Sequence, residues 1–427
     1  MRWLYIPDED DPDFIAKQET ISRIEKWWQD FESVVVPMWK TSSNLSENLE
    51  NTESEVSDFS GWVAENIHRI HPNIMWEFHK NPSGDDDFVC TVEDSYTDGA
   101  LIQTMVEMAP QLDQWCFLRY RPPCEFDTIP EFLKHSAGLN VPNDIRVSWV
   151  KSEINKIDLC YFSGTFTGDL RIDLVLTLKL TSAILGEEMF ENWINGAEAL
   201  RPISTPIRML NNLIGKSSPV THNTSNLLNQ CLKIKKQIED SLPDKYVSEL
   251  IFPHHHDDTP VCMWHRTPNE DAVPAYIPRR LIYCFTIESL LKAVLSGIYF
   301  HSHCHSKLNE IFCFIEITDF DMGQNDSLER RDNIAIRIDN ELRQKALGCV
   351  IGVGSGMDSC YVDLALRNVE KSVPILREIA SDMEFPESSW LLFYDSNLRD
   401  EWVGLYKTTK APPVIEEEPL DYKPNLD

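Results

Sequence analysis

The sequence predicts an α+β protein, in which a helix-flanked, mostly antiparallel sheet domain is followed by a ferredoxin-like βαββαβ domain. Two observations predict this class. Helix-like and strand-like hydrophobic periods alternate along the chain, and a glycine-rich hairpin joins the strand-like runs 348–354 and 360–366. An expected strand and helix precede this hairpin, and another helix and strand follow it, which is the order of a split β-α-β domain.

Composition divides the sequence into four parts. Residues 1–200 form the expected N-terminal α+β domain, and residues 201–280 are a proline-punctuated connector with one plausible helix. Residues 281–408 carry the βαββαβ order. Residues 409–427 are rich in Pro, Glu and Asp, and such a segment cannot bury enough apolar surface to fold, so we expect an acidic disordered tail.

The N-terminal part shows a helical period first and strand periods later. Apolar residues recur at spacings of three and four over 14–36, and Pro37 is expected to end that helix. Residues 41–58 are polar and are interpreted as a loop. Further helices are expected over 61–70 and 99–112, and strands over 75–79, 88–92, 115–120, 145–162 (with an internal turn) and 170–180. The last strand is expected because apolar and mostly polar residues alternate along it.

The C-terminal part supplies the elements of the ferredoxin-like order. The run 311–317 is apolar on both faces at first, as is typical of a central strand. A helix is expected over 328–347, and a further helix and the strand 390–394 follow the hairpin. We therefore expect 311–317 and 360–366 to be adjacent, central strands of one sheet.

The charge balance excludes some partners and favours others. The chain has 69 acidic and 39 basic residues and a formal net charge of −30. Such a chain is repelled by nucleic-acid phosphates and by anionic membranes, whereas a protein with a basic surface is attracted. An acidic surface also keeps many bacterial cytosolic proteins soluble without any binding role. The sequence does not set the oligomeric state.

The cysteines indicate a reducing compartment. There are 11 of them, an odd number, and no C-x-x-C pair occurs. Several lie in strand-like runs, where a thiol behaves as a small buried hydrophobic group. The N-terminus turns acidic before an apolar signal region could form, and no apolar run has the length of a membrane span. We therefore expect a cytoplasmic protein.

The glycine-rich hairpin is a candidate ligand site. Its backbone could cradle a phosphate or another small ligand at Gly352, Gly354, Gly356 and Asp358. The dinucleotide fingerprint, however, runs from a strand into a helix, whereas this run joins two strands. Glycines are also needed in hairpins for backbone geometry alone.

The histidines are a candidate metal site. Seven of the 12 lie in two segments, 254–265 and 301–305, and imidazole is a common zinc ligand. If residues 301–304 formed an extended strand, alternate side chains would share a face. The spacing matches no established zinc motif. We predict no cofactor, and zinc stays an open possibility. The candidate zinc ligands are His254, His256, His265, His301, His303 and His305.

The middle of the N-terminal part resembles a bacterial protein family of unknown function. The matching pattern is the strand 88–92, the helix ending in Ala109-Pro110, the strand starting at Trp115 and the stop Arg121-Pro122-Pro123. The later Leu185-Gly186-Glu187 fits as well, so the resemblance spans about residues 60–200. The glycine hairpin and its flanks look like a companion domain of such proteins. The resemblance implies no catalytic residues.

These observations favour a non-catalytic binding or regulatory protein, in its sharpest form an immunity-type protein that binds a basic partner. Two alternatives stay open. One is a metal-dependent enzyme that uses the histidines of 254–265 and 301–305. The other is a small-ligand sensor that uses the glycine-rich hairpin.

Overall fold

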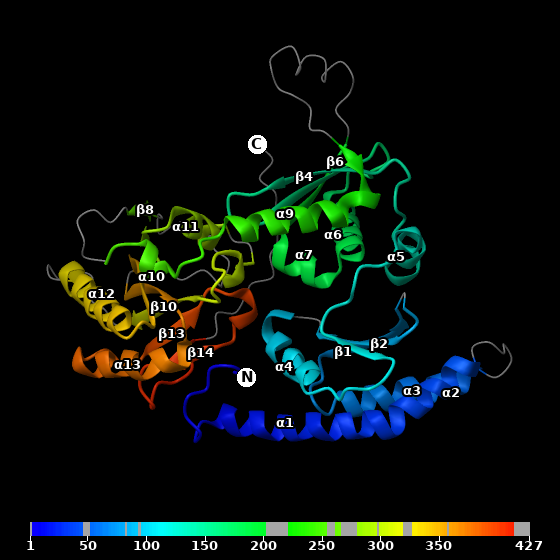
Figure 1. Ribbon diagram of the computed structural model, residues 1–427. Coiled ribbons are helices and arrows are strands. Elements are labelled where there is room, and N and C mark those ends of the chain that lie inside the picture. Colours follow the sequence, from blue (N-terminus) through cyan, green and yellow to red (C-terminus); the bar gives the residue numbers. More distant parts are fainter. Residues whose placement is uncertain are drawn as a thin grey trace, which may run out of the picture. The chain divides into compact units, whose positions relative to one another are not determined.

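The computed structural model is mixed α and β, with several sheets (Figure 1). By contacts it forms two compact units: unit 1 runs to Arg121 and includes Asn397–Glu401, and unit 2 comprises Pro122–Ser396 and the chain from Trp402 onward. The four-part division drawn from the sequence stays a prediction. The residues that the structure describes are 2–45, 52–81, 83–92, 95–201, 221–253, 261–265, 280–296, 299–318, 327–356 and 358–413.

Unit 1 packs helices against a three-stranded sheet of order β1-β2-β3. The first pair of strands is antiparallel and the second is parallel, with a helix in the connection between them. The elements are α1 (Pro12–Asp30), the π-helix η1 (Phe31–Val35), α2 (Val36–Leu45), α3 (Thr52–Ile67), β1 (Ile74–Lys80), β2 (Asp86–Val92), α4 (Ser95–Glu107) and β3 (Trp115–Leu118).

Aromatic side chains fill the core of unit 1. The ring of Phe31 is fully buried and lies 5.1 Å from the ring centroids of both Phe88 and Trp115. Trp27 and Trp28 of α1 pack into the same cluster. Each such edge-on or tilted pair adds about 0.5–1.5 kcal/mol beyond burial of its area.

The first helix continues past Pro37, and the expected end there is wrong. The turn before the proline is the π-helix η1, in which the Val36 N–H donates to the Phe31 carbonyl five residues back. A wider turn relieves the clash between a proline ring and the preceding turn, so α2 continues to Leu45. The loop expected over 41–58 is also wrong in part, because α3 begins at Thr52.

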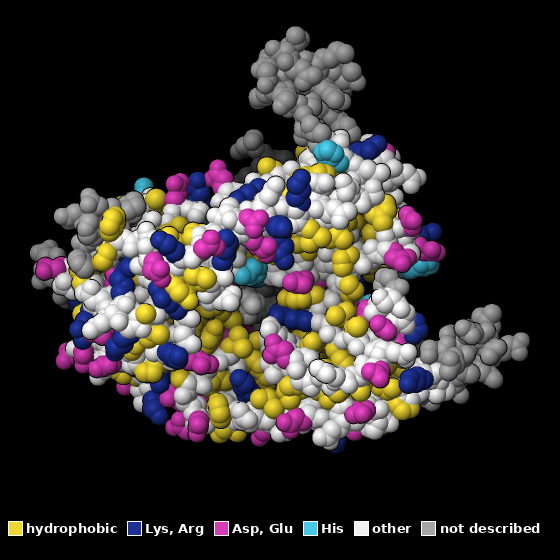
Figure 2. Space-filling view, in the orientation of Figure 1, with side chains coloured by type: hydrophobic (Ala, Val, Ile, Leu, Met, Phe, Trp, Pro, Cys, Tyr) yellow, Lys and Arg dark blue, Asp and Glu magenta, His cyan; other side chains and the backbone are white. Residues whose placement is uncertain are grey.

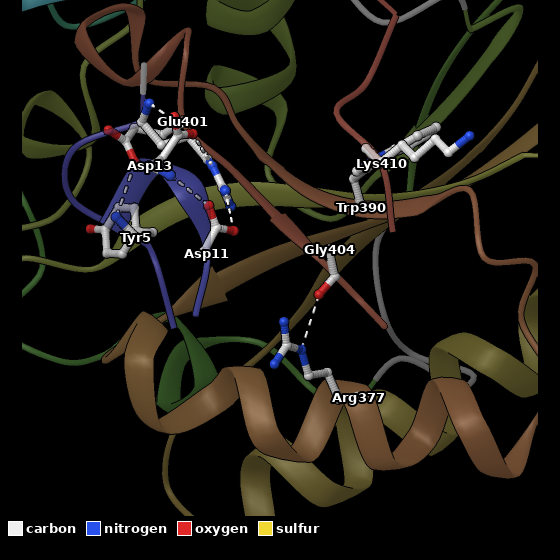
Figure 3. A network of polar contacts seen from close by, with 9 residues as sticks. Tyr5, Asp11, Asp13, Arg377, Trp390, Glu401, Gly404 and Lys410 are labelled. Carbon is white, nitrogen blue, oxygen red and sulfur yellow. Dashed lines mark hydrogen bonds and ion pairs between the residues drawn. The ribbon is translucent and has the colours of Figure 1, made fainter. Parts of the chain in front are cut away.

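The N-terminal strand-like segment of unit 1 is held by one buried carboxylate (Figure 3). Glu401 accepts hydrogen bonds from the backbone N–H groups of Trp3, Leu4 (2.9 Å) and Tyr5 (3.0 Å). Arg2 bonds to Asp13 over 2.9 Å. In unit 2, the same figure shows the indole N–H of Trp390 donating to the Lys410 carbonyl.

Unit 2 contains a four-stranded sheet of order β6-β5-β4-β7. Strands β4 and β5 form the antiparallel hairpin that was expected within 145–162, and β6 runs parallel to β5. Helices α6, α7 and α9 gather at this sheet (Figure 1). The elements are η2 (Phe126–Thr128), α5 (Ile129–Ala137), β4 (Arg146–Lys151), β5 (Ile157–Phe162), α6 (Leu170–Leu185), α7 (Glu187–Trp193), β6 (Ile194–Leu200), β7 (His222–Asn223), η3 (Thr224–Asn226), α9 (Leu227–Ser241) and α10 (Val247–Leu250).

The strand expected over 170–180 is wrong, because these residues begin α6. The carboxylate of Asp169 caps the helix by accepting from the N–H groups of Arg171 and Ile172. Apolar residues alternate along this segment, but the buried residues recur at the spacings of three and four that are typical of a helix. Leucine also has a high helix propensity. The buried positions are Asp173, Leu176, Thr177, Leu180, Thr181, Ala183, Ile184 and Leu185.

Unit 2 also contains a seven-stranded sheet of order β14-β13-β10-β12-β11-β9-β8. Strands β10 and β12 are adjacent and antiparallel near its centre, as expected, and α12 and α13 contact each other (Figure 1). The elements are β8 (Cys262–His265), β9 (Ile282–Phe285), α11 (Glu288–Leu295), η4 (Ser302–Cys304), β10 (Ile311–Thr318), α12 (Ser327–Gln344), β11 (Gly348–Ser355), β12 (Ser359–Leu366), α13 (Val369–Asp382), β13 (Ser389–Phe393), η5 (Ser396–Leu398) and β14 (Trp402–Gly404).

Candidate functional site

The glycines of the hairpin make room for neighbouring protein atoms. A Cβ atom at Gly352 would lie 2.6 Å from the Cys284 carbonyl oxygen of β9 and 3.0 Å from an Asp363 carboxylate oxygen. A Cβ atom at Gly354 would lie 2.8 Å from the Ile282 carbonyl oxygen. These two glycines therefore permit close packing of β9 on β11.

The other two predicted ligand residues lie at the turn of the hairpin. The Gly356 N–H donates to the Ser359 carbonyl over 2.8 Å, which closes the turn. Gly356 is buried and Asp358 is exposed. The hairpin thus brings Gly352 and Gly354 beside charged side chains, while Asp358 points to solvent, and a ligand role for these residues stays a prediction.

A fully buried ion pair lies beside the glycines. The guanidinium of Arg280 donates from Nη1 to Asp363 Oδ2 over 2.8 Å and from Nη2 to Oδ1 over 2.6 Å. Both side chains are 0% exposed. Such fork-to-fork pairing compensates the cost of removing both charges from water. No local sequence pattern predicts this pair, because the partners lie 83 positions apart.

Four aromatic rings enclose this pair. The Arg280 guanidinium carbon lies 4.4 Å from the Tyr361 ring centroid, 5.0 Å from that of Phe314 and 5.2 Å from that of Tyr283. The Tyr394 hydroxyl donates to Asp363 over 2.5 Å, and burial raises the pKa of this hydroxyl, so it keeps its proton. Both Nη atoms of Arg280 and the Asp363 carboxylate are therefore paired, whereas Arg280 Nε has no hydrogen-bond partner among the described residues. The paired groups favour a structural role.

The structure locates only some of the predicted metal ligands. His254 and His256 lie outside the described residues. His265 is exposed at the end of β8. His301 precedes the short 3₁₀ helix η4, His303 lies within it and His305 follows it. The extended strand that would place these three side chains on one face is therefore not formed.

Within the part of the chain that the structure describes, no group of three or more His, Cys, Asp or Glu side chains is placed to hold a metal ion. The rings of His301 and His303 lie 5.5 Å apart. His303 lies 5.3 Å from the Trp193 ring, and His305 stacks on Phe300 at 5.0 Å. The zinc hypothesis gains no support from these residues.

A buried serine–aspartate pair fixes the histidine segment. The Ser302 backbone N–H and hydroxyl both donate to Asp395, and the Ser302 oxygen accepts from the Phe312 N–H over 2.9 Å. Burial raises the pKa of Asp395 to about 6, while the bonds from Ser302 oppose that rise. The segment is therefore attached to the start of β10 and to the end of β13.

Lys156 lies at the turn of the β4–β5 hairpin, against the histidine segment. The neighbouring Asn155 donates to the Cys304 carbonyl over 3.1 Å, and Ser152 closes the turn with a 2.8 Å bond to the Lys156 carbonyl. Lys156 is 2% exposed, and its ammonium has no hydrogen-bond partner among the described residues. Burial lowers its pKa to about 8, while Cys304 opposes the shift.

Most thiols of the chain are poor nucleophiles. The 11 cysteines all lie among the described residues, and none is joined to another in a disulfide. Burial raises the pKa of Cys304 to about 12, so its thiolate is scarce at neutral pH. Burial also raises the pKa of Cys90, Cys116, Cys160, Cys231, Cys284, Cys313, Cys349 and Cys360.

Helix α6 presents an apolar surface that the sequence did not predict. Leu170, Ile172, Leu174 and Val175 lie in its first two turns and are 61%, 49%, 44% and 47% exposed. Scattered apolar residues are normal on a protein surface, but four exposed apolar residues in two turns of one helix are a candidate interaction site. The strand assignment did not reveal it, since a strand would have placed Ile172 and Leu174 on an apolar face that packs in a core. We call these four residues the α6 apolar surface.

Charge is spread widely on the part of the surface that Figure 2 draws, where acidic and basic side chains are interspersed. Attraction of a basic partner on this face therefore depends on the net charge of −30 rather than on one acidic patch. Among the described residues, no helix has both the length and the apolar character needed to cross a membrane.

In comparisons with protein-family models, curated proteins and solved structures, nothing matches this chain. The resemblance of residues 60–200 to a bacterial family of unknown function therefore stays a prediction.

Proposed function

We propose that the chain is a non-catalytic, cytoplasmic binding or regulatory protein of the immunity type, which recognises a basic protein partner through the α6 apolar surface. The observation that carries the proposal is the exposure of Leu170, Ile172, Leu174 and Val175 on one helix. Burying such side chains at an interface contributes roughly 25 cal/mol per Å² of apolar area. The net charge of −30 adds long-range attraction for a basic partner.

Two further observations support a binding role over a catalytic one. The raised thiol pKa values disfavour cysteine nucleophiles. The charged groups beside Gly352 and Gly354, Asp363 and Arg280, are bound to each other in a bidentate pair. A catalytic acid or base needs a free position near the reacting atoms.

We also propose that β10, α12, β11, β12, α13 and β13 form a ferredoxin-like unit. The strand order β13-β10-β12-β11 supports this, because that fold places its fourth, first, third and second strands side by side. The antiparallel pairing of every neighbouring pair in this set is a second support.

A pull-down from the native host tests the partner proposal. A variant with Leu174→Ser and Val175→Ser should lose its partner and keep its fold, because both side chains are exposed. The control is Val150→Ser, which removes an exposed apolar residue (59% exposed) from β4 instead. Recovery of the same partners by both variants would exclude α6 as the interface.

The salt dependence of partner association, together with a DNA-binding assay, tests the electrostatic part of the proposal. Association with the partner should slow as the salt concentration rises through the screening range, since the Debye length falls to about 8 Å at 0.15 M. The full chain should not bind duplex DNA at that salt concentration. A salt-independent association rate would contradict the basic-partner assignment.

A further inference from the structure

Several basic groups lie close together around Lys156, in a chain that is strongly acidic overall. Lys156 adjoins Asn155, whose side chain is bonded to the Cys304 carbonyl, so its turn lies against the residues that flank Cys304. The ring of His303 lies 5.3 Å from that of Trp193, and the Lys235 ammonium lies 5.3 Å from the same tryptophan ring. Lys235 and His303 therefore lie at one tryptophan ring, and Lys156 is next in sequence to the residue that bonds to Cys304, the neighbour of His303.

The charge of these groups is poorly compensated. The Lys156 ammonium has no hydrogen-bond partner among the described residues, and Lys235 has only a loose ion pair with Glu239 at 3.8 Å. Desolvation of the imidazole lowers the pKa of His303, and the positive charges of Lys156 and Lys235 lower it further. The residue as a whole is exposed.

A buried ammonium without a partner is costly unless a negative group approaches it. His303 is exposed whereas Lys156 is buried, so His303 is the member of the group that solvent reaches. A neutral imidazole still offers one N–H donor, and each lysine offers three. The set thus combines two positive charges with several donors.

We propose that Lys156, Lys235 and His303 form a binding site for a small phosphate-type dianion. Two ammonium groups match the charge of a dianion better than that of a carboxylate, and His303 supplies a further donor at the rim. This site is separate from the α6 apolar surface and does not depend on partner binding there. The global charge of −30 opposes the anion at long range, so binding is expected where salt screens that charge.

Thermal unfolding of the full chain with inorganic phosphate tests the site. At 0.15 M constant ionic strength, millimolar phosphate should raise the apparent Tm by about 2–4 °C, because a ligand that binds only the folded state stabilises it. Lys156→Met should abolish the rise. Lys151→Met should keep it, since Lys151 is an exposed lysine on the same hairpin.

The controls give each outcome a meaning. An equal rise in the wild type and in both variants would reveal the general stabilising effect of phosphate as a salt and would overturn the proposal. No rise in the wild type would do the same. An equal rise with acetate would overturn the assignment to a dianion.

A second measurement covers the case in which Lys156→Met fails to fold. The pKa of His303, followed by NMR in the wild type, should rise when phosphate is present, because a bound anion favours the imidazolium. Lys235→Met should weaken this rise by severalfold. A His303 pKa that does not respond to phosphate would contradict the site.

Discussion

Two buried cations in unit 2 have opposite surroundings. Arg280 is held by a bidentate bond to Asp363 and enclosed by aromatic rings. Lys156 is equally removed from solvent, at 2% exposure, but its ammonium has no hydrogen-bond partner among the described residues. The charge of Arg280 is neutralised by Asp363 within the protein, whereas the charge of Lys156 is not neutralised and could be compensated by a ligand.

This difference predicts stability effects of opposite sign. Removing one member of a satisfied buried pair leaves the other uncompensated, which is strongly destabilising. Removing an unpaired buried charge takes away a cost and is stabilising. The same physical quantity, desolvation of a charge, therefore separates a structural residue from a candidate functional one.

The largest effect is expected at the closed pair. Asp363→Ala should lower the free energy of unfolding by about 3–5 kcal/mol, because it leaves the Arg280 guanidinium buried and unpaired. Urea denaturation measures this. The matched control is Asp358→Ala in the exposed turn of the same hairpin, which should change stability by less than about 0.5 kcal/mol.

Replacing both partners sharpens the same point. Arg280→Met combined with Asp363→Leu should cost less than Asp363→Ala alone, since no charge is then left unpaired. A double variant as unstable as the single one would show that packing around the pair, and not the uncompensated charge, controls the loss.

The next effect is expected at Lys156. Lys156→Met should raise the free energy of unfolding at pH 7 by about 1–3 kcal/mol. The native pKa of about 8 lies below the usual 10.5, so between these values the unfolded chain binds a proton that the folded chain has released. Wild-type stability should therefore rise by about 3 kcal/mol, relative to the variant, from pH 8 to pH 10.5. Parallel pH profiles of the two proteins would contradict this assignment.

A smaller loss is expected at the glycines beside the closed pair. Gly352→Ala should cost about 1–3 kcal/mol, because its Cβ would lie 2.6 Å from a backbone carbonyl that cannot move freely. Gly196→Ala on β6 is the control, since no atom lies within 4 Å of its Cβ position. Thermal unfolding should rank the two variants clearly. Equal midpoints would show that β9 can shift away from β11.

The smallest stability effect is expected on α6. Leu174→Ser should change the free energy of unfolding by less than about 0.5 kcal/mol, because the side chain is 44% exposed. Leu176→Ser, two positions along, should cost several times more, since Leu176 is 6% exposed. Similar losses at both positions would mean that the apolar surface is packed in the folded chain.

Much of the C-terminal sheet could be predicted from local patterns. The runs 311–317 and 360–366 are strands in which all residues but one are apolar, and the helix 328–347 has a regular spacing of four, so their periods leave little ambiguity. The N-terminal errors arose where two signals overlapped. In 170–180 a strand-like alternation lies on a helix that is capped by Asp169, and the cap was the better guide.

The candidate site residues depend on contacts that no local pattern encodes. Lys156 lies in a polar turn sequence that is typical of solvent exposure, yet Asn155 bonds to Cys304 across 149 positions. Arg280 and Asp363 are likewise joined across 83 positions. The cluster of histidines in 301–305 could be noticed in the sequence, whereas nothing in the sequence marked Lys156 as buried.

The most direct test of this account is the pKa of the Lys156 ammonium in the folded protein. It can be followed by NMR of the labelled lysine side chains, with the signal assigned by its loss in Lys156→Met. The account predicts titration near pH 8, since the amine is buried without a compensating partner. Titration near or above 10.5 would show that the amine is solvated or paired, and would contradict both the contrast with Arg280 and the proposed anion site.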